Sequence, residues 1–557
     1  MKLLDILIAL LTALIAAMLL TGGTVLHLPH AKIEFSSLDP WMLVLLLLLW
    51  LQQRRGQATG LETISRGTAY FADPSRGNRR SLRLFVGVVL AATAAHFLKH
   101  WNFDTHALDV LPIHQPIYWP FGSPPLRCDQ CIGGTFLSSH QAFPLLAFGA
   151  LFQIPLFRAP LFADEWIFAI QSAIAACAVL WSLRILCIDR KPGLVFWAIL
   201  PLIASRAFRS GLVWDFREDV LGFAFLLSAC ACLQKRRWAA YSVFVFLAAI
   251  SKENFAFVTA FLAVPAWFVA RSRLASVLTL LFSLTYAAFV FRWVIPHFNP
   301  VNQTDIVSRL GDFGQSPAEI VSNLLSSPKA WWMVLRTRLF TFDRIKYLVL
   351  LFAPFAPLLS RRSLPWLAPL IPAIAMNLVS NTSNQRTLQF HYDWITLPFL
   401  VMGVWAALEG VSARIAGRRA AWTMLFVLTL SGRWPGWDIS RHWPSPGLGD
   451  GLTGAFADRA YLRELRIEEP PGHAAGPAPG ARIYANGHIL AQLTLQPDYR
   501  LWLAEPLDLA RLNPGDVVII DGREVGDSAL AAALHSPGYS PRGQSPSGRF
   551  SVYERGN

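Results

Sequence analysis

The stretch DVLGFAFLLSACACLQKRRWAAYSVFVFLAAISKENFAFVTAFLAVPAWFVARSR, residues 219–273, contains the pattern that decides the fold. Three long apolar runs alternate with short polar ones, and they cover 219–233, 238–250 and 255–270. Basic residues follow the first and the third run, whereas the mixed motif SKEN separates the second from the third. Apolar runs divided in this way are typical of membrane-spanning helices whose basic loops stay in the cytoplasm.

The composition of the whole chain agrees with this interpretation. Of its 557 residues, 54% are hydrophobic and 15% are charged, whereas a soluble domain has about 25% charged residues. By itself, the net charge of +14 would fit nucleic-acid binding. However, the basic residues lie in short clusters between apolar runs and form no single patch, so we exclude nucleic acid as a partner. We expect part of this charge to meet anionic membrane lipids.

We therefore expect an all-α polytopic membrane protein with about thirteen transmembrane helices. Residues 1–81 are predicted to hold two of them, at 5–22 and 40–51, followed by an arginine-rich cytoplasmic loop. Residues 82–434 are predicted to form the transmembrane core, with a long first outer loop at 99–140. Basic clusters follow alternate spans of this core, at Arg190 and Lys191, Lys235 to Arg237, Arg271 and Arg273, Arg361 and Arg362, and Arg414 to Arg419.

Three further segments have their own patterns. Residues 141–157 contain Pro144 and Pro155 and are expected to be interfacial or re-entrant, because a crossing there would reverse the side of every later basic cluster. The alternating residues 23–37 predict a short hairpin. Residues 435–557 are rich in Pro and Gly and contain the strand-like runs ARIYAN and DVVIIDG, which predict a small extracytoplasmic α/β domain.

Polar motifs gather in the loops on the outer side of this topology. They are FDTHALD with Asp104 and Asp109, SSHQAFP with His140, WDFRED with Asp215, Arg217, Glu218 and Asp219, SKEN with Lys252 and Glu253, and QFHYD with His391, Tyr392 and Asp393. Ionisable residues near membrane depth are costly, so their shared side favours a functional site. Each motif alone also fits a structural role, as a capped helix end, a surface ion pair or an interfacial anchor.

The motif CDQC, with Cys128 and Cys131, lies in the first outer loop. In an oxidising compartment a disulfide is the favoured interpretation. A zinc site would need two more ligands, for which the same loop offers His106, His114 and His140. A thioredoxin-like redox pair would need a βαβ context that this part of the sequence lacks.

The order and spacing of the outer motifs resemble the GT-C superfamily of membrane glycosyltransferases. More closely, they resemble an uncharacterised family of predicted membrane proteins within it. Members carry a Phe-Asp…Asp element after a span, then His-x-x-Pro, an acidic element, Lys-Glu-Asp/Asn and a late His-Tyr. The resemblance covers most of residues 82–505. This chain has HALDVLP where members tend to have Gly-Ile-Phe-Asp-Gln.

The resemblance implies a GT-C-like fold and inverting transfer of a sugar from a polyprenyl-phosphate donor on the extracytoplasmic face of a bacterial inner membrane. The N-terminus would lie inside and the C-terminal domain outside. Asp104 is the expected general base, with Asp109 as second candidate. Lys252, Arg217 and His391 are the expected ligands of the donor phosphate. His140, Asp215, Glu218, Glu253 and Tyr392 would support them. Some members of the superfamily use a divalent metal such as Mg²⁺ or Mn²⁺, and the sequence leaves that choice open.

Two other functions compete with this one. A transporter or flippase for a lipid-linked or small polar solute would also be polytopic, but it would be expected to show internal repeats and polar groups at mid-span. A non-catalytic scaffold would bind a partner through its outer C-terminal domain. A closed outer cavity would favour the enzyme, and a polar path through both leaflets would favour transport.

Overall fold

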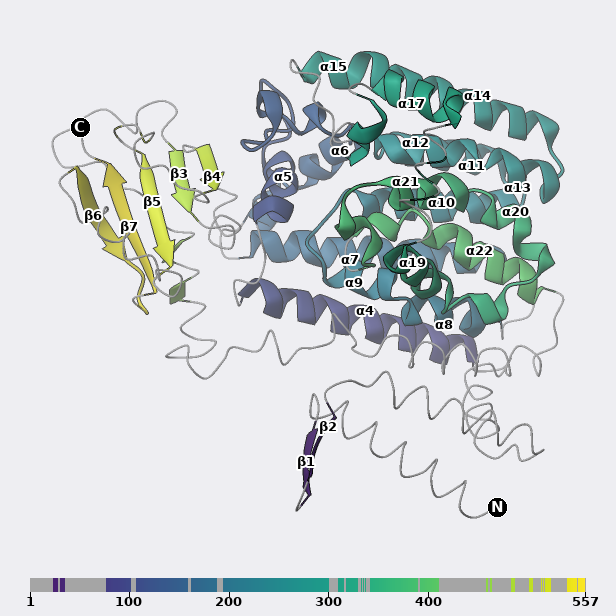
Figure 1. The fold of residues 1–557 in the computed structure, drawn as a ribbon, viewed down its shortest axis with the longest axis horizontal. Coiled ribbons are helices and arrows are strands. Elements are labelled where there is room, and N and C mark those ends of the chain that lie inside the picture. The colour runs from purple at the N-terminus through teal and green to yellow at the C-terminus, as the bar shows by residue number, and fades with distance from the viewer. Residues whose placement is uncertain are drawn as a thin grey trace.

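The computed structural model describes residues 77–101, 107–158, 162–187, 194–299 and most of 309–409. It also describes a hairpin at 24–35 and short segments between 457 and 555. The predicted spans at 5–22, 40–51 and 420–434 lie outside the described residues. Figure 1 shows a body of packed helices, which contains the candidate site, and a separate sheet formed by the C-terminal strands.

Three of the described helices are long and apolar enough to cross a membrane. They are α4 (Gly77–Trp101), α7 (Ala163–Cys187) and α14 (Arg273–Phe289), the last continued through a π-turn into α15 (Ile295–Phe298). A helix of 25 residues is about 38 Å long and exceeds the roughly 30 Å of a bilayer core. The outer face of α14 exposes Leu274, Leu278 and Leu281, as expected for contact with lipid.

A fourth span would be formed by α8 (Leu194–Ala204) and α9 (Arg206–Val213), which are bent by 66° at Ser205. The other apolar helices of the core are shorter: α10 (Asp219–Gln234), α11 (Trp238–Ala249), α12 (Glu253–Ala260), α13 (Ala263–Phe268), α21 (Leu370–Val379) and α22 (Leu397–Leu408). The described residues thus contain three to four spans by length and composition. The expected total of about thirteen stays a prediction.

Basic residues lie at one set of helix ends, and the polar motifs lie at the other. Helix α4 carries the basic residues Arg79 and Arg80 in its first turn, α10 ends beside Lys235, and Arg271 lies between α13 and α14. The opposite ends carry the outer motifs, because α10 begins after Glu218 and α12 after Lys252. Since α10 packs against both α7 and α11, the polar motifs are brought to one end of the helical body.

The first outer loop is more ordered than the sequence suggested. Residues 99–140 were expected to form a loop, but α5 (Ala107–Tyr118) is helical despite Pro112 and Pro116. The segment after it contains two 3-10 turns, at Ile132–Gly134 and Phe136–Ser138. Helix α6 (Pro144–Leu151) has 8 residues and is about 12 Å long, too short to cross a bilayer. This agrees with the expectation that 141–157 does not span.

The region 309–396 completes the body with short elements. Besides α21, its described α-helices are α17 (Pro317–Ser326), α19 (Phe342–Phe352) and α20 (Leu364–Leu367). Its 3-10 turns lie at Gly311–Phe313, Ala356–Leu358, Arg361–Ser363, Ser383–Arg386 and His391–Asp393. Another 3-10 turn, Pro155–Arg158, follows α6. Bulky side chains fill the core around these elements, and Trp197, Trp366, Trp394 and Trp405 are fully buried.

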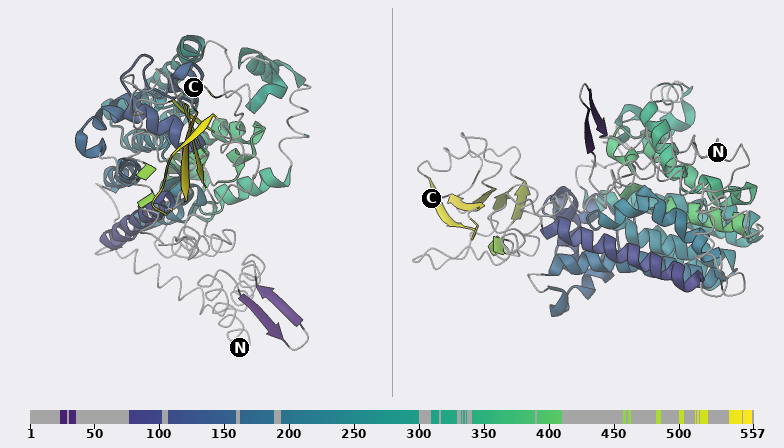
Figure 2. Two further views of the ribbon diagram at one scale, coloured as in Figure 1. Left: turned by 90° about the vertical axis from the view of Figure 1, so that its left-hand side faces the viewer. Right: turned by 90° about the horizontal axis from the view of Figure 1, so that it is seen from below.

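The strands form two sheets. The predicted hairpin is present as β1 (Thr24–Leu28) and β2 (Ala31–Phe35), which pair antiparallel. The C-terminal sheet has the order β4-β3-β5-β7-β6, with β3 (Arg482–Ala485), β4 (Arg500–Leu503), β5 (Val517–Asp521), β6 (Tyr539–Gln544) and β7 (Phe550–Arg555). The runs ARIYAN and DVVIIDG supply β3 and β5. The right-hand view in Figure 2, seen from below, shows this sheet beside the helices.

Candidate functional site

The centre of the candidate site is a buried lysine held by two carboxylates. The Lys252 ammonium nitrogen lies 2.5 Å from Glu218 Oε1 and 2.8 Å from Asp219 Oδ2. Burial alone would lower the pKa of Lys252, but the carboxylates of Asp219 and Glu218 raise it above its ordinary value. Burial alone would raise the pKa of Glu218, but Lys252 lowers it. The lysine and Glu218 are therefore both charged at neutral pH.

Close helix packing brings these groups together. Glu218 and Asp219 open α10, and Lys252 precedes the first residue of α12. Gly222, one turn into α10, faces the ring of Phe255 in α12. A Cβ atom at Gly222 would lie 2.4 Å from Phe255 Cζ, so only glycine permits this approach. The glycine thus leaves room for the Phe255 ring where the motifs WDFRED and SKEN meet.

The late motif QFHYD reaches the same place. His391 Nε2 lies 3.7 Å from Asp219 Oδ2. Burial lowers the pKa of His391 well below its ordinary value, and the nearby cations Arg217 and Lys252 lower it further. His391 is therefore a neutral imidazole at physiological pH, so it would serve a phosphate as a neutral hydrogen-bond donor.

Asp393, two residues after His391, is fixed by neutral donors. The Tyr347 hydroxyl donates to Asp393 Oδ1 at 2.7 Å, and the Asn377 amide donates to the same oxygen at 3.2 Å. Burial raises the pKa of Asp393 to about 7, although both hydrogen bonds act against the rise. These bonds join the His391–Asp393 turn to α19 and α21.

His140 enters the site from the first outer loop. Its Nδ1 lies 2.8 Å from Glu253 Oε1, and both side chains are largely buried. The neighbouring Gln141 amide donates to the carbonyl oxygen of Ala249 at the end of α11. Upstream, Cys128 and Cys131 are joined by a disulfide, so these thiols are not zinc ligands here. His140 instead orients one oxygen of the Glu253 carboxylate.

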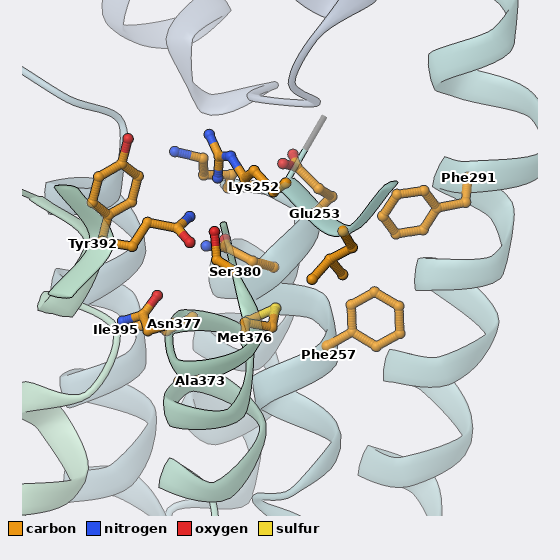
Figure 3. Close-up of a pocket in the computed structure, with 14 residues that line it drawn as sticks. Lys252, Glu253, Phe257, Phe291, Ala373, Met376, Asn377, Ser380, Tyr392 and Ile395 are labelled. Carbon is orange, nitrogen blue, oxygen red and sulfur yellow. The ribbon is translucent and has the colours of Figure 1, made fainter. Parts of the chain in front are cut away.

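A cavity of about 90 Å³ opens beside this cluster. One part of its wall is polar and includes Lys252, Glu253, Asn254, Arg309, Gln385 and Tyr392; the other is apolar and includes Phe257, Phe291, Ala373, Met376 and Ile395. Figure 3 shows Lys252, Glu253 and Tyr392 on one side of it, with Phe257 and Met376 below. The cavity is therefore amphipathic, with charged groups at one end of apolar helices.

Asp215 belongs to a different cluster from the one the sequence suggested. The carboxylate accepts a hydrogen bond from the Lys99 ammonium at 3.0 Å, and His96 Nε2 lies 3.4 Å away. Burial alone would raise the pKa of Asp215, but Lys99 and His96 lower it below its usual range. The WDFRED segment is thus divided, because Asp215 faces α4 while Glu218 faces α12. Gln171 of α7 supports the segment by accepting a hydrogen bond from the backbone N–H of Arg217.

A further buried network connects α5 and α7. Asp164 Oδ1 lies 2.7 Å from His114 Nδ1 and accepts a hydrogen bond from the Tyr118 hydroxyl at 2.8 Å. Asp164 Oδ2 lies 3.5 Å from His100 Nε2 in α4. The sequence had suggested His114 only as a zinc ligand, whereas its partner here is a carboxylate from another helix.

Of the two aspartates expected to act as bases, the structure describes only the backbone position of Asp109. Asp104 lies outside the described residues, three positions after the end of α4. Asp109 lies in the first turn of α5. Lys252, Glu218, Glu253, His140, His391 and Tyr392 are brought together as expected. Arg309, Gln385 and Asn254 also line the cavity. Arg309 and Gln385 stand in no motif, and Asn254 had been noted only as the last letter of SKEN.

The described residues contain no group of three or more His, Cys, Asp or Glu side chains arranged to hold a metal ion. A pair formed by Asp104 and Asp109 falls outside that search. The divalent metal that the resemblance allows therefore stays a prediction, and no step below depends on one.

Comparison with known proteins gives one family and one solved structure. No curated protein matches the chain. The crystal structure of ArnT from Cupriavidus metallidurans bound to undecaprenyl phosphate is similar over 84% of this chain and 97% of that chain, at 12% identity and a TM-score of 0.44. The model of a family described as predicted membrane protein (DUF2079) matches residues 127–434, a range that contains every described motif of the site. The match covers more than half of the chain, and the protein therefore belongs to the DUF2079 family of predicted membrane proteins.

Proposed function

We propose that this protein is a membrane glycosyltransferase that moves a sugar from a polyprenyl-phosphate donor to an acceptor hydroxyl on the extracytoplasmic face. The observation that carries the proposal is the convergence of four separated motifs beside one amphipathic cavity among apolar helices. SKEN and QFHYD line the cavity, and the motifs of His140 and Glu218 contact SKEN. A lipid-linked sugar has the same division, since its phosphate is charged and its chain is apolar. The resemblance of these motifs to the GT-C superfamily supports the same reaction class.

Lys252 is the proposed ligand of the donor phosphate. Its ammonium is held in place by two carboxylates and lines the cavity together with Arg309. A cation fixed before the substrate arrives stabilises charge on the leaving phosphate without reorganising. Neutral His391 would add a hydrogen bond. The apolar wall, including Phe257 and Phe291, would exclude water from the reacting bond.

In the proposed reaction, the acceptor oxygen attacks the anomeric carbon as the bond from that carbon to the phosphate oxygen breaks. The polyprenyl phosphate leaves with the bonding electrons, and the proton of the acceptor passes to a carboxylate base. Asp104 is the proposed base and Asp109 the second candidate. Attack opposite the leaving group inverts the anomeric centre. The end of α4, from which the chain leads to Asp104, approaches the WDFRED segment through the contact of Lys99 with Asp215.

The test uses the full-length protein in liposomes that contain a polyprenyl phosphate carrying a radiolabelled sugar. We expect the wild type to release bare polyprenyl phosphate and to pass the label to an added acceptor extract. Asp104→Asn should slow transfer by at least about 100-fold, because general-base catalysis typically contributes that much. Glu409→Gln, at the exposed far end of α22, should behave as the wild type.

Two results would contradict the proposal. Unchanged transfer by Asp104→Asn would remove Asp104 as the base. Movement of the intact labelled lipid between leaflets, with no cleavage of its sugar, would show a flippase instead of a transferase. The inner-membrane location and the outward orientation belong to the same proposal, and protease protection of the C-terminal region in oriented vesicles would test them.

A further inference from the structure

Glu253 has a free oxygen that the phosphate-binding role does not explain. Its Oε1 is engaged by His140, but its buried Oε2 has no hydrogen-bond partner among the described residues. Leaving a buried acceptor unpaired is costly, and more so for a charged one. A ligand that donates a hydrogen bond to this carboxylate would remove the cost.

Two other side chains at the same cavity repeat this feature. Within the described part of the chain, the carbonyl oxygens of Asn254 and Gln385 are also buried and unpartnered. Both residues line the cavity with Glu253. Two acceptor oxygens from α12 and one from the Ser383–Arg386 turn therefore lie at one cavity without a hydrogen-bond donor among the described residues. Phosphate and prenyl groups supply none, whereas sugar hydroxyls supply several.

The size of the cavity selects the same part of the substrate. The cavity volume of about 90 Å³ is several times the roughly 10–15 Å³ that a cavity needs to hold a single water. This space suits one sugar ring and is too small for a long prenyl chain. The apolar part of the cavity wall carries Phe257 and Phe291, whose rings lie 5.6 Å apart. These rings suit the apolar C–H face of a sugar.

We propose that this cavity is the subsite for a single monosaccharide unit and that Glu253 is the residue that reads its hydroxyl groups. The inference rests on the proposed function and names the part of the donor that fills the cavity. The phosphate would then stand at the rim, beside Lys252 and Arg309. His140 is a positioning residue, since it fixes the Glu253 carboxylate through Oε1 and leaves Oε2 for the sugar.

The experiment measures the binding of two kinds of probe to the full-length detergent-purified protein. One is bare farnesyl phosphate, and the other is farnesyl phosphate carrying mannose, glucose or galactose. The wild type should bind at least one glycoside more tightly than the bare phosphate. Glu253→Gln keeps an oxygen for His140 and should reduce that preference by about 10- to 100-fold, the range for a hydrogen bond to a charged group. Its affinity for bare farnesyl phosphate should not fall, because the substitution removes a negative charge near Lys252.

A second variant tests the same proposal in case Glu253→Gln does not fold. Met376→Phe narrows the apolar wall of the cavity and leaves the polar wall intact, so it should also abolish the preference for the glycoside while bare farnesyl phosphate still binds. Glu409→Gln is the matched control, because it makes the same chemical change at an exposed position, the C-terminal end of α22, that does not line the cavity.

Each other outcome overturns a defined claim. If Glu253→Gln keeps the preference, Glu253 does not contact the sugar. If Met376→Phe weakens both probes equally, the cavity holds the lipid chain. If the wild type binds bare farnesyl phosphate but prefers no glycoside, the sugar subsite is wrong while the proposed function stands. If the wild type binds no prenyl phosphate at all, the proposed function fails as well.

Discussion

The buried lysine cluster allows stability and function to be tested separately. Lys252→Met keeps most of the side-chain volume and removes the ammonium that contacts Glu218 and Asp219 at 2.5 and 2.8 Å. Both carboxylates are almost completely buried, so breaking the pair should cost about 3–5 kcal/mol. A carboxylate left without Lys252 can also take up a proton and become neutral. Protonating a carboxyl of ordinary pKa near 4 at pH 7 costs about 4 kcal/mol, which sets a similar upper limit on the loss of stability for that carboxylate.

The triple variant Lys252→Met/Glu218→Gln/Asp219→Asn removes all three charges together. Neutral replacement of a complete buried ion cluster is often close to neutral for stability, so this variant should regain most of the melting temperature that Lys252→Met loses. It should still lack sugar transfer, because the phosphate ligand is gone. The assays are thermal unfolding in detergent and transfer in liposomes. If Lys252→Met were as stable as the wild type, the unpaired buried carboxylates would not carry the expected cost. If the triple variant still transferred sugar, Lys252 would not be the phosphate ligand.

Two further predictions follow from contacts around the same site. Gly222→Ala would force Phe255 away and separate Lys252 from its carboxylates, so transfer should fall at least about tenfold. Gly87→Ala is the control, because an added Cβ there meets nothing within 4 Å; it should leave transfer unchanged and, inside helix α4, should not lower the melting temperature. Equal behaviour of the two variants would contradict the packing argument. Asp393 has its pKa raised to about 7, so the folded state keeps a proton that the unfolded state loses near pH 4, and stability should fall by about 1.4 kcal/mol per pH unit as pH rises toward 7. Asp393→Asn should remove that slope from a series of melting temperatures between pH 5 and 8, and an unchanged slope would assign it to another group.

The sequence predicted the class of fold and much of the site because both depend on patterns along the chain. Apolar runs between basic clusters predicted membrane helices, and α10 and α11 lie where the runs 219–233 and 238–250 do. The order of the outer motifs predicted that Lys252, Glu218 and His391 would meet. Strand-like runs likewise located β3 and β5.

What the sequence could not predict depends on contacts between distant segments. Nothing near Pro112 and Pro116 indicated that α5 would be helical, because its stability comes from packing and from the link between His114 and Asp164. Arg309 stands in no motif, and its place at the cavity depends on contacts between segments that are far apart in the sequence. The neutral state of His391 results from burial among cations, which no local pattern reveals.

The division of WDFRED is the least expected of these results and has the widest consequence. Asp215 is tied to Lys99 at the end of α4, and Glu218, three residues later, is tied to Lys252 at the start of α12. Only two residues separate Asp215 from Glu218, so the two ion pairs limit the distance between the end of α4 and the cation proposed to bind phosphate. A base and a phosphate ligand must act on opposite sides of one anomeric carbon, and a short link of this kind is a physical means of keeping them at a constant separation.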